Sequence, residues 1–142
     1  MRETALSIRK LGPEDIELVH SAADLFDDPP IKEQTKAFLE SDRDHIWIAY
    51  LGQEPVGMLT ATTLLHPDKS PHIFVNELGI DDDYRRRGIA TRLMAEAVSF
   101  ARSCGLTPLW LAAEGDDDQA NAFYRSLSEP TERVSVVYEW EE

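Results

Sequence analysis

The chain has 142 residues, of which 42% are hydrophobic and 29% charged, and its formal net charge is −13. We expect one domain spanning residues 1–142, because a chain of this length can bury a core of its own. So strong a negative charge repels nucleic acid and anionic membranes, and we expect neither as a partner. The charge could also serve only to keep the protein soluble.

The sequence offers no sign of export, membrane insertion or metal binding. Cys104 is the single cysteine, which excludes an internal disulfide. No apolar run approaches the ~20 residues that span a bilayer, and the start M-R-E-T-A-L lacks the apolar region of a signal peptide. We therefore expect a cytoplasmic protein. The four histidines show no ligand spacing, so no metal is expected.

The first half of the chain is typical of a strand, two helices and a hairpin. Alternating or helically spaced apolar residues and the breaks at Gly12-Pro13 and Pro29-Pro30 set these limits. The expected elements are a strand over Ala5–Leu11, helices over Pro13–Phe26 and Ile31–Ser41, and hairpin strands over His45–Tyr50 and Pro55–Thr63.

The second half alternates strands with helices. The expected elements are a strand over His72–Ile80, a turn over Asp81–Arg87, a helix over Gly88–Cys104, a strand over Leu109–Ala113, a helix over Gln119–Leu127 and a strand over Arg133–Trp140. Gly105 can end the longer helix with positive φ. The order β-α-α-β-β-β-α-β-α-β predicts an α+β (mixed α/β) fold with a central mixed sheet flanked by helices.

The stretch N-E-L-G-I-D-D-D-Y-R-R-R-G-I-A-T-R, residues 76–92, resembles an anion-binding site. A strand leads through an acidic turn into a helix whose first amides have no intrahelical partner. Gly88 lets the backbone approach a ligand closely, and arginines add charge-assisted hydrogen bonds to phosphate oxygens. The pattern favours a pyrophosphate site. The alternative is an ordinary helix start beside a solvated basic patch.

Two spaced motifs resemble those of the GNAT superfamily of acetyl-CoA-dependent N-acetyltransferases. One is Arg85-x-x-Gly88-x-Ala90 after a strand, and the other is A-N-A-F-Y-R-S-L, which contains Asn121 and Tyr124. Shorter sequence motifs, among them Leu11-Gly12-Pro13, are similar to motifs of the aminoglycoside 3-N-acetyltransferase branch. The resemblance implies the GNAT fold, acetyl-CoA as co-substrate, and a role in aminoglycoside resistance.

The resemblance also implies where the co-substrate binds. The pyrophosphate of CoA would lie on the helix start, with the pantetheine arm added as an extra strand beside the preceding strand. Asn121 would bond the pantetheine or the neighbouring backbone, and Gly79 could ease a splay of the strand away from Leu109–Ala113. The residues implied are Leu78, Gly79, Ile80, Arg85, Arg86, Arg87, Gly88, Ile89, Ala90, Thr91 and Asn121.

Two side chains are candidate proton carriers. Tyr124 would protonate the departing thiolate, although its spacing also suits a buried helix stripe. Glu77 would take a proton from the acceptor amine, and we expect it to be partly desolvated in an apolar strand. The alternative is a solvent-facing residue, since period-two alternation would place Glu77 on one face with Val75 and Gly79.

The expected acceptor is a small cationic amine, with aminoglycosides first. Carboxylates at Glu114, Asp116 and Asp117, with Glu77, would bind it, although aspartates there can also cap the following helix, and we expect capping for Asp118. Protein N-termini or lysines are alternative acceptors, and a CoA-binding module without catalysis is an alternative function. The last strand, 133–140, could serve a homodimer or core packing equally well.

Overall fold

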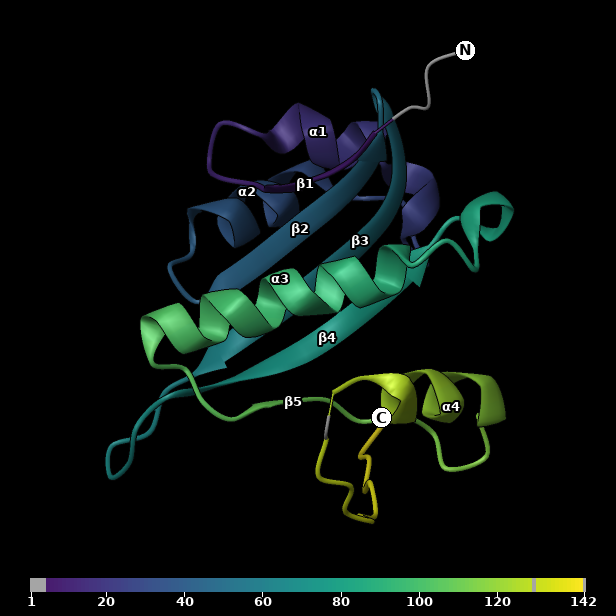
Figure 1. The fold of residues 1–142 in the computed structure, drawn as a ribbon. Helices are drawn as coiled ribbons and strands as arrows, with labels where there is room; N and C mark the ends of the chain where they lie inside the picture. The colour runs from purple at the N-terminus through teal and green to yellow at the C-terminus, as the bar shows by residue number, and fades with distance from the viewer. Residues whose placement is uncertain (1–4, 129, 142) are drawn as a thin grey trace. The chain divides into compact units, whose positions relative to one another are not determined.

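The computed structural model describes residues 5–128 and 130–141. These residues form two compact units, the first ending at Leu111 and the second beginning at Ala112. The single-domain organisation remains a prediction. The first unit holds β1 (Leu6–Lys10), α1 (Ile16–Ser21), the short helix η1 (Ala23–Leu25), α2 (Lys32–Glu40), β2 (Asp44–Leu51), β3 (Glu54–Leu64), β4 (His72–Ile80), η2 (Asp82–Tyr84), α3 (Ile89–Cys104) and β5 (Leu109–Trp110) (Figure 1).

The first unit is built on a five-stranded sheet in the order β1-β2-β3-β4-β5. Neighbouring strands from β1 to β4 run antiparallel, and β5 runs parallel to β4. This mixed sheet with its helices confirms the predicted α+β fold class. β4 begins and ends where the sequence predicted, whereas β5 is only two residues long and the expected strand to Ala113 is shorter.

Helices cover both faces of the sheet, with α3 across one face and α1 and α2 on the other (Figure 1). The Cα of Gly57 in β3 lies so close to α3 that an added Cβ would come within 3.0 Å of Ile89 and 3.1 Å of Leu93. On the opposite face, Ile48 and Met58 pack with residues of α1 and α2. Each fully buried aliphatic side chain, such as Ile48, contributes about 1.5–3 kcal/mol.

The ends of α3 follow from its flanking glycines. Gly88 precedes the helix with φ 77°, and Gly105 ends it with φ 68°. The amide of Gly105 donates to Arg102 O, and that of Leu106 donates to Ala101 O at 2.8 Å. These bonds satisfy carbonyls of the last turn, which confirms the predicted helix stop at Gly105.

β4 contains a bulge, beyond which each side chain lies on the opposite face of the sheet from the one that regular alternation would give it. Ala61 of β3 pairs with Val75, but the preceding Thr60 pairs with Glu77, so Asn76 is the extra residue. Because paired residues share a face, Glu77 lies opposite to Val75, and the simple alternation expected from the sequence is wrong here. Glu77 instead shares its face with Gly79 and with Asn76, whose amide donates to Thr62 Oγ1 at 2.7 Å.

The second unit contains one regular element among its described residues, helix α4 (Asp118–Ser126). The side chain of Asp117, not Asp118, caps it by accepting the amide of Ala120 at 3.0 Å. The predicted strand over 133–140 is wrong: the segment has no strand, and its apolar side chains are exposed. In residues 5–128 and 130–141, no helix combines the length and apolarity that a membrane crossing requires.

Candidate active site

The turn before α3 offers unpaired backbone amides. Arg86 has φ 65° and Gly88 has φ 77°, so two left-handed residues alternate within three positions. No side chain caps the first turn of α3, and that turn contains no acidic residue. The first intrahelical bond is donated by Arg92, whose amide reaches Gly88 O at 3.1 Å. Among the described residues, the amides of Ile89, Ala90 and Thr91 therefore have no partner, and they can bind an anion in a geometry that favours one.

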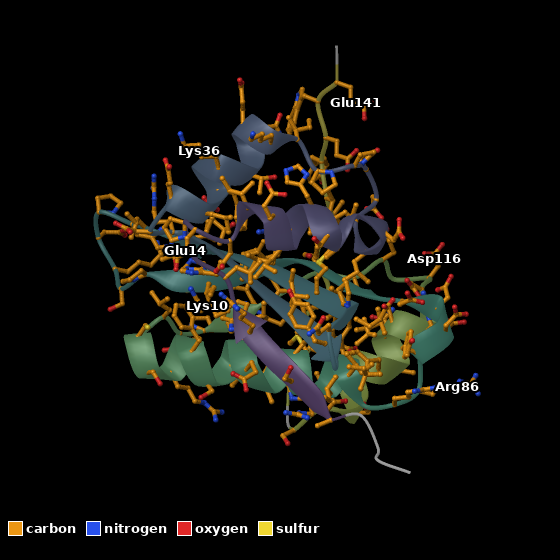
Figure 2. All side chains as sticks on the ribbon, turned by 90° about the horizontal axis from the view of Figure 1, so that it is seen from above. Lys10, Glu14, Lys36, Arg86, Asp116 and Glu141 are labelled. Carbon is orange, nitrogen blue, oxygen red and sulfur yellow. The ribbon has the colours of Figure 1, made fainter. Side chains whose placement is uncertain are left out.

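The three arginines of this turn differ in their partners. The guanidinium of Arg85 is 2.9 Å from Asp82, and that of Arg87 lies over the ring of Tyr84, 5.0 Å from its centroid. Arg86 is exposed and extends away from the backbone (Figure 2). Within the described part of the chain no ion pair or ring contact engages Arg86, so its charge is the most available for a ligand.

The outer edge of β4 is paired for only part of its length. β5 pairs with it at Ile73 and Phe74 and no further. From Val75 to Ile80, a stretch that includes Leu78, this edge has no strand partner among the described residues. An extended ligand could therefore bind the strand's backbone there, as the sequence predicted for pantetheine.

The structure explains the glycine at position 79 differently from the sequence analysis, which related Gly79 to a splay of the strand. The irregularity of β4 is the bulge at Asn76, not a distortion at Gly79. A Cβ on Gly79 would stand 2.9 Å from the carbonyl oxygen of Leu25, which is a backbone atom and would shift only at a cost in stability. The glycine therefore lets η1 pack closely against β4, on the face that also carries Glu77.

Glu77 is exposed, so the expected desolvation is not observed. Its carboxylate accepts a hydrogen bond from the Thr60 hydroxyl at 3.1 Å. Next to it, Thr62 donates to Asp44 Oδ1 at 3.1 Å and accepts from Asn76. The face thus carries two carboxylates whose orientation is fixed by threonine hydroxyls.

The sequence reasoning missed this threonine network. Thr60 and Thr62 carry a visible signal, since alternate threonines in a strand place two hydroxyls on one face. Asn76 and Asp44 carry none, because their contribution depends on the bulge and on the pairing register. No group of three or more potential ligands among residues 5–128 and 130–141 is arranged to hold a metal ion.

The second unit holds the other predicted site residues, described here on their own. Tyr124 is half-buried beside Phe123, with ring centroids 5.2 Å apart. Burial, and secondly the negative charge of Asp117, raise the pKa of the Tyr124 phenol above its usual value. The Asn121 amide donates to Glu114 O and Asp117 O, both at 2.9 Å, and so fixes the loop before α4. The side chains of Glu114, Asp116 and Asp117 are exposed.

Comparisons with known proteins agree with this fold. The model of the acetyltransferase (GNAT) family matches residues 15–128. An uncharacterized N-acetyltransferase of Methanocaldococcus jannaschii is 28% identical over 109 residues, which cover 74% of this chain and 46% of that protein. The chain spans less than half the length of the curated relatives it matches.

Solved structures give the same result for the fold. An aminoglycoside acetyltransferase from an uncultured soil metagenomic sample, crystallised with trehalose, superimposes with a TM-score of 0.90 at 24% identity, over 96% of both chains. Aminoglycoside N-acetyltransferase AAC(6′)-Iy in complex with CoA gives 0.76 at 20% identity, over 97% of both chains.

The comparisons differ from the sequence analysis in one detail and confirm its main result. The name of the CoA-bound enzyme refers to the 6′ position, whereas the sequence words resembled the 3-N branch. At such identities the likeness shows the fold alone. The family match covers most of the chain and confirms the expected acyltransferase class: this protein belongs to the GNAT acetyltransferase family.

Proposed function

We propose that this protein transfers an acetyl group from acetyl-CoA to a primary amine of a small cationic acceptor, with an aminoglycoside as the first acceptor to test. One observation carries the proposal: β4 has an open edge from Val75 to Ile80 that leads into the uncapped start of α3. That arrangement offers the backbone groups of a strand edge to an extended ligand and the amides of a helix start to its pyrophosphate. Acetyl-CoA would supply the acetyl group as an activated thioester.

The residues present fit this co-substrate. The amides of Ile89, Ala90 and Thr91, with the guanidinium of Arg86, would hold the pyrophosphate. The backbone of Leu78 and Ile80 would hold the pantetheine amides as a neighbouring strand does. Arg85 and Arg87 add positive charge while their partners Asp82 and Tyr84 fix the turn.

Glu77 would act as the general base. Its carboxylate is oriented by Thr60 and open to solvent, so it can take a proton from an ammonium acceptor directly or through water. An amine must be neutral to act as a nucleophile, and this step supplies that form.

Tyr124 would act as the general acid. A phenol whose pKa is raised by burial keeps its proton throughout the neutral range, and that proton is available to a departing thiolate. The Asn121 amide, by holding the loop at Glu114 and Asp117, would fix the start of the helix that carries Tyr124.

Transfer would be direct, without an acyl-enzyme. Cys104, the single cysteine, is the last residue of the 16-residue helix α3. At 1.5 Å per residue it lies about 20 Å from the anion-binding end of the same helix. The acceptor amine itself is then the nucleophile, in a complex that holds both substrates.

The exposed carboxylates suit a cationic acceptor. Glu77 and Asp44 lie on one face of the sheet, while Glu114, Asp116 and Asp117 form the acidic loop of the second unit. Each of these acidic groups, taken on its own, would attract and orient cations.

The test is thiol release from acetyl-CoA with a panel of amines: an aminoglycoside, a linear diamine, a peptide with a free N-terminus and a lysine peptide. We expect the aminoglycoside to give the highest kcat/KM. Turnover confined to a peptide would move the acceptor class to proteins. Tight CoA binding without turnover on any amine would make the chain a CoA-binding module and overturn the proposal.

A further inference from the structure

A cluster of four rings lies at the N-terminal end of β4, outside the residues assigned above. The indole Nε1 of Trp110 donates to His72 Nδ1 at 2.8 Å. The ring of His66 stacks on that of His72, with centroids 4.6 Å apart and planes 6° from parallel. The Trp110 ring also contacts that of Phe74, with ring centroids 4.5 Å apart. All four residues belong to the first unit.

This ring cluster lies beside the candidate acceptor face. Phe74 and Trp110 are the last residues that β4 and β5 pair before the edge of β4 opens. Phe74 pairs with Thr62 and Glu77 pairs with Thr60, so both side chains lie on the same face of the sheet. Because Asn76 is the extra residue of the bulge, their partners Thr62 and Thr60 are only two residues apart on β3, which is about 7 Å.

The indole of Trp110 presents an open apolar surface there. It is 43% exposed although its N–H is bonded and one side is packed on Phe74. Large exposed aromatics that are fixed in place are typical of ligand contacts, since they bury area at little entropic cost. The nearest polar groups along the strand, Asn76 and Glu77, suit an amine attached to a ring.

We propose that Trp110 is the surface on which the ring of a ring-bearing amine acceptor stacks, and that His72, supported by His66, is the positioning residue that holds the indole in place while His72 is neutral. This inference rests on the proposed function and names the acceptor class that the site would take.

The dependence on charge follows from the hydrogen bond. A neutral imidazole has one free nitrogen that can accept, whereas a protonated one carries N–H on both and cannot. Protonation of His72 therefore removes the acceptor of the indole N–H. The other charged groups at this end are His66, Lys69 and Asp68. Burial, then the positive charges of Lys69 and His72, lower the pKa of His66, with Asp68 opposing.

The structural part of the proposal can be tested without turnover. The chain has three tryptophans, and a Trp110→Phe variant assigns the indole N–H signal of Trp110 by NMR. We expect that signal to move in a transition as the pH is lowered, because protonation of His72 removes the acceptor of the indole N–H. His72→Gln, which keeps an accepting oxygen that does not titrate, should remove the transition. His20→Gln, a histidine change on α1, should leave it intact. A wild-type signal that stays constant, or a transition that survives His72→Gln, overturns the positioning role.

The acceptor part is tested by titrating the same signal with two amines, kanamycin as a ring-bearing probe and 1,5-diaminopentane as an open-chain one. We expect kanamycin alone to shift it. Trp110→Ala should weaken kanamycin binding by about three- to tenfold. At a pH below the transition the wild type should lose a similar factor relative to His72→Gln. If the wild type and Trp110→Ala bind kanamycin with equal affinity, Trp110 is not the stacking surface. If kanamycin binds at Trp110 but no amine is acetylated, the stacking role of Trp110 is supported and the proposed function fails.

Discussion

The two ends of β4 differ in the atoms that they offer to a ligand. At the C-terminal end, the site consists of backbone: the open strand edge, the left-handed Arg86 and Gly88, and the uncapped amides of α3. At the bulge and before it, the site consists of side chains: Glu77 on Thr60, Asn76 on Thr62, and Trp110 on His72. Backbone groups can bind an extended ligand without selecting its side groups, whereas side chains can select an acceptor by its charge and shape.

The largest expected effect is at the side-chain end. Glu77→Gln removes the proposed base and should lower kcat by about 10²–10³-fold while the Kd for CoA stays constant. The matched control is Asp44→Asn, a carboxylate of the same face that Thr62 orients in the same way. Steady-state kinetics and calorimetric CoA titration give both numbers. Equal losses in the two variants would mean that the face contributes only charge.

The proton donor is expected on neither end of β4 but on α4. Tyr124→Phe should lower kcat by about 10²-fold without weakening CoA binding. Since the pKa of Tyr124 is raised, the phenol loses its proton only above about pH 10. The pH–rate profile between about pH 6 and 9 should therefore keep its shape in Tyr124→Phe. If the variant instead removes an alkaline limb within that range, Tyr124 titrates there and the assigned role is wrong.

At the backbone end, Arg86 and Arg85 should contribute unequally to CoA binding. Arg86→Ala should weaken CoA binding by about tenfold, because Arg86 carries the least engaged charge. Arg85→Ala should cost less, since that guanidinium is already paired with Asp82. Arg86→Gly removes the side chain but keeps the left-handed backbone, so it separates the contribution of the guanidinium from that of the backbone conformation. Isothermal titration with CoA measures all three. A loss confined to kcat in Arg86→Ala would contradict a phosphate contact.

The smallest effect is expected between the two ends, at Gly79. A Cβ there would clash with the Leu25 carbonyl, so Gly79→Ala should lower the free energy of unfolding by about 1–3 kcal/mol. CoA affinity should change little, because the displaced segment η1 lies on the Glu77 face. Gly115→Ala, where nothing lies within 4 Å of the added atom, is the control. Urea unfolding that gives the same midpoint for both variants would show that η1 yields without cost.

The turn at the backbone end could be predicted from the sequence, whereas at the side-chain end the sequence pointed to Glu77 but not to the residues that surround it. Arginines followed by Gly88 and a helical pattern already specify a turn with positive φ and free amides. The bulge at Asn76 leaves no such mark, because Val75, Glu77 and Gly79 still alternate in the sequence. The contact of His66 with His72 likewise depends on how the loop between β3 and β4 closes.

In the second unit, the sequence analysis predicted an element that the structure does not contain. Val134, Val136, Tyr138 and Trp140 alternate as a strand should, yet residues 133–140 form none. Alternation states which side chains would share a face, but a strand also needs an edge to pair with. The cap of α4 was misplaced by one residue, from Asp117 to Asp118, because several aspartates in a row offer the same chemistry.

The central claim is that the two ends of β4 bind different substrates, and crossed kinetics on two variants test it most directly. Arg86→Ala should raise the KM for acetyl-CoA and leave the KM for a ring-bearing amine unchanged. Trp110→Ala should do the reverse. The account is contradicted if both variants raise the same KM, or if each raises both to the same degree.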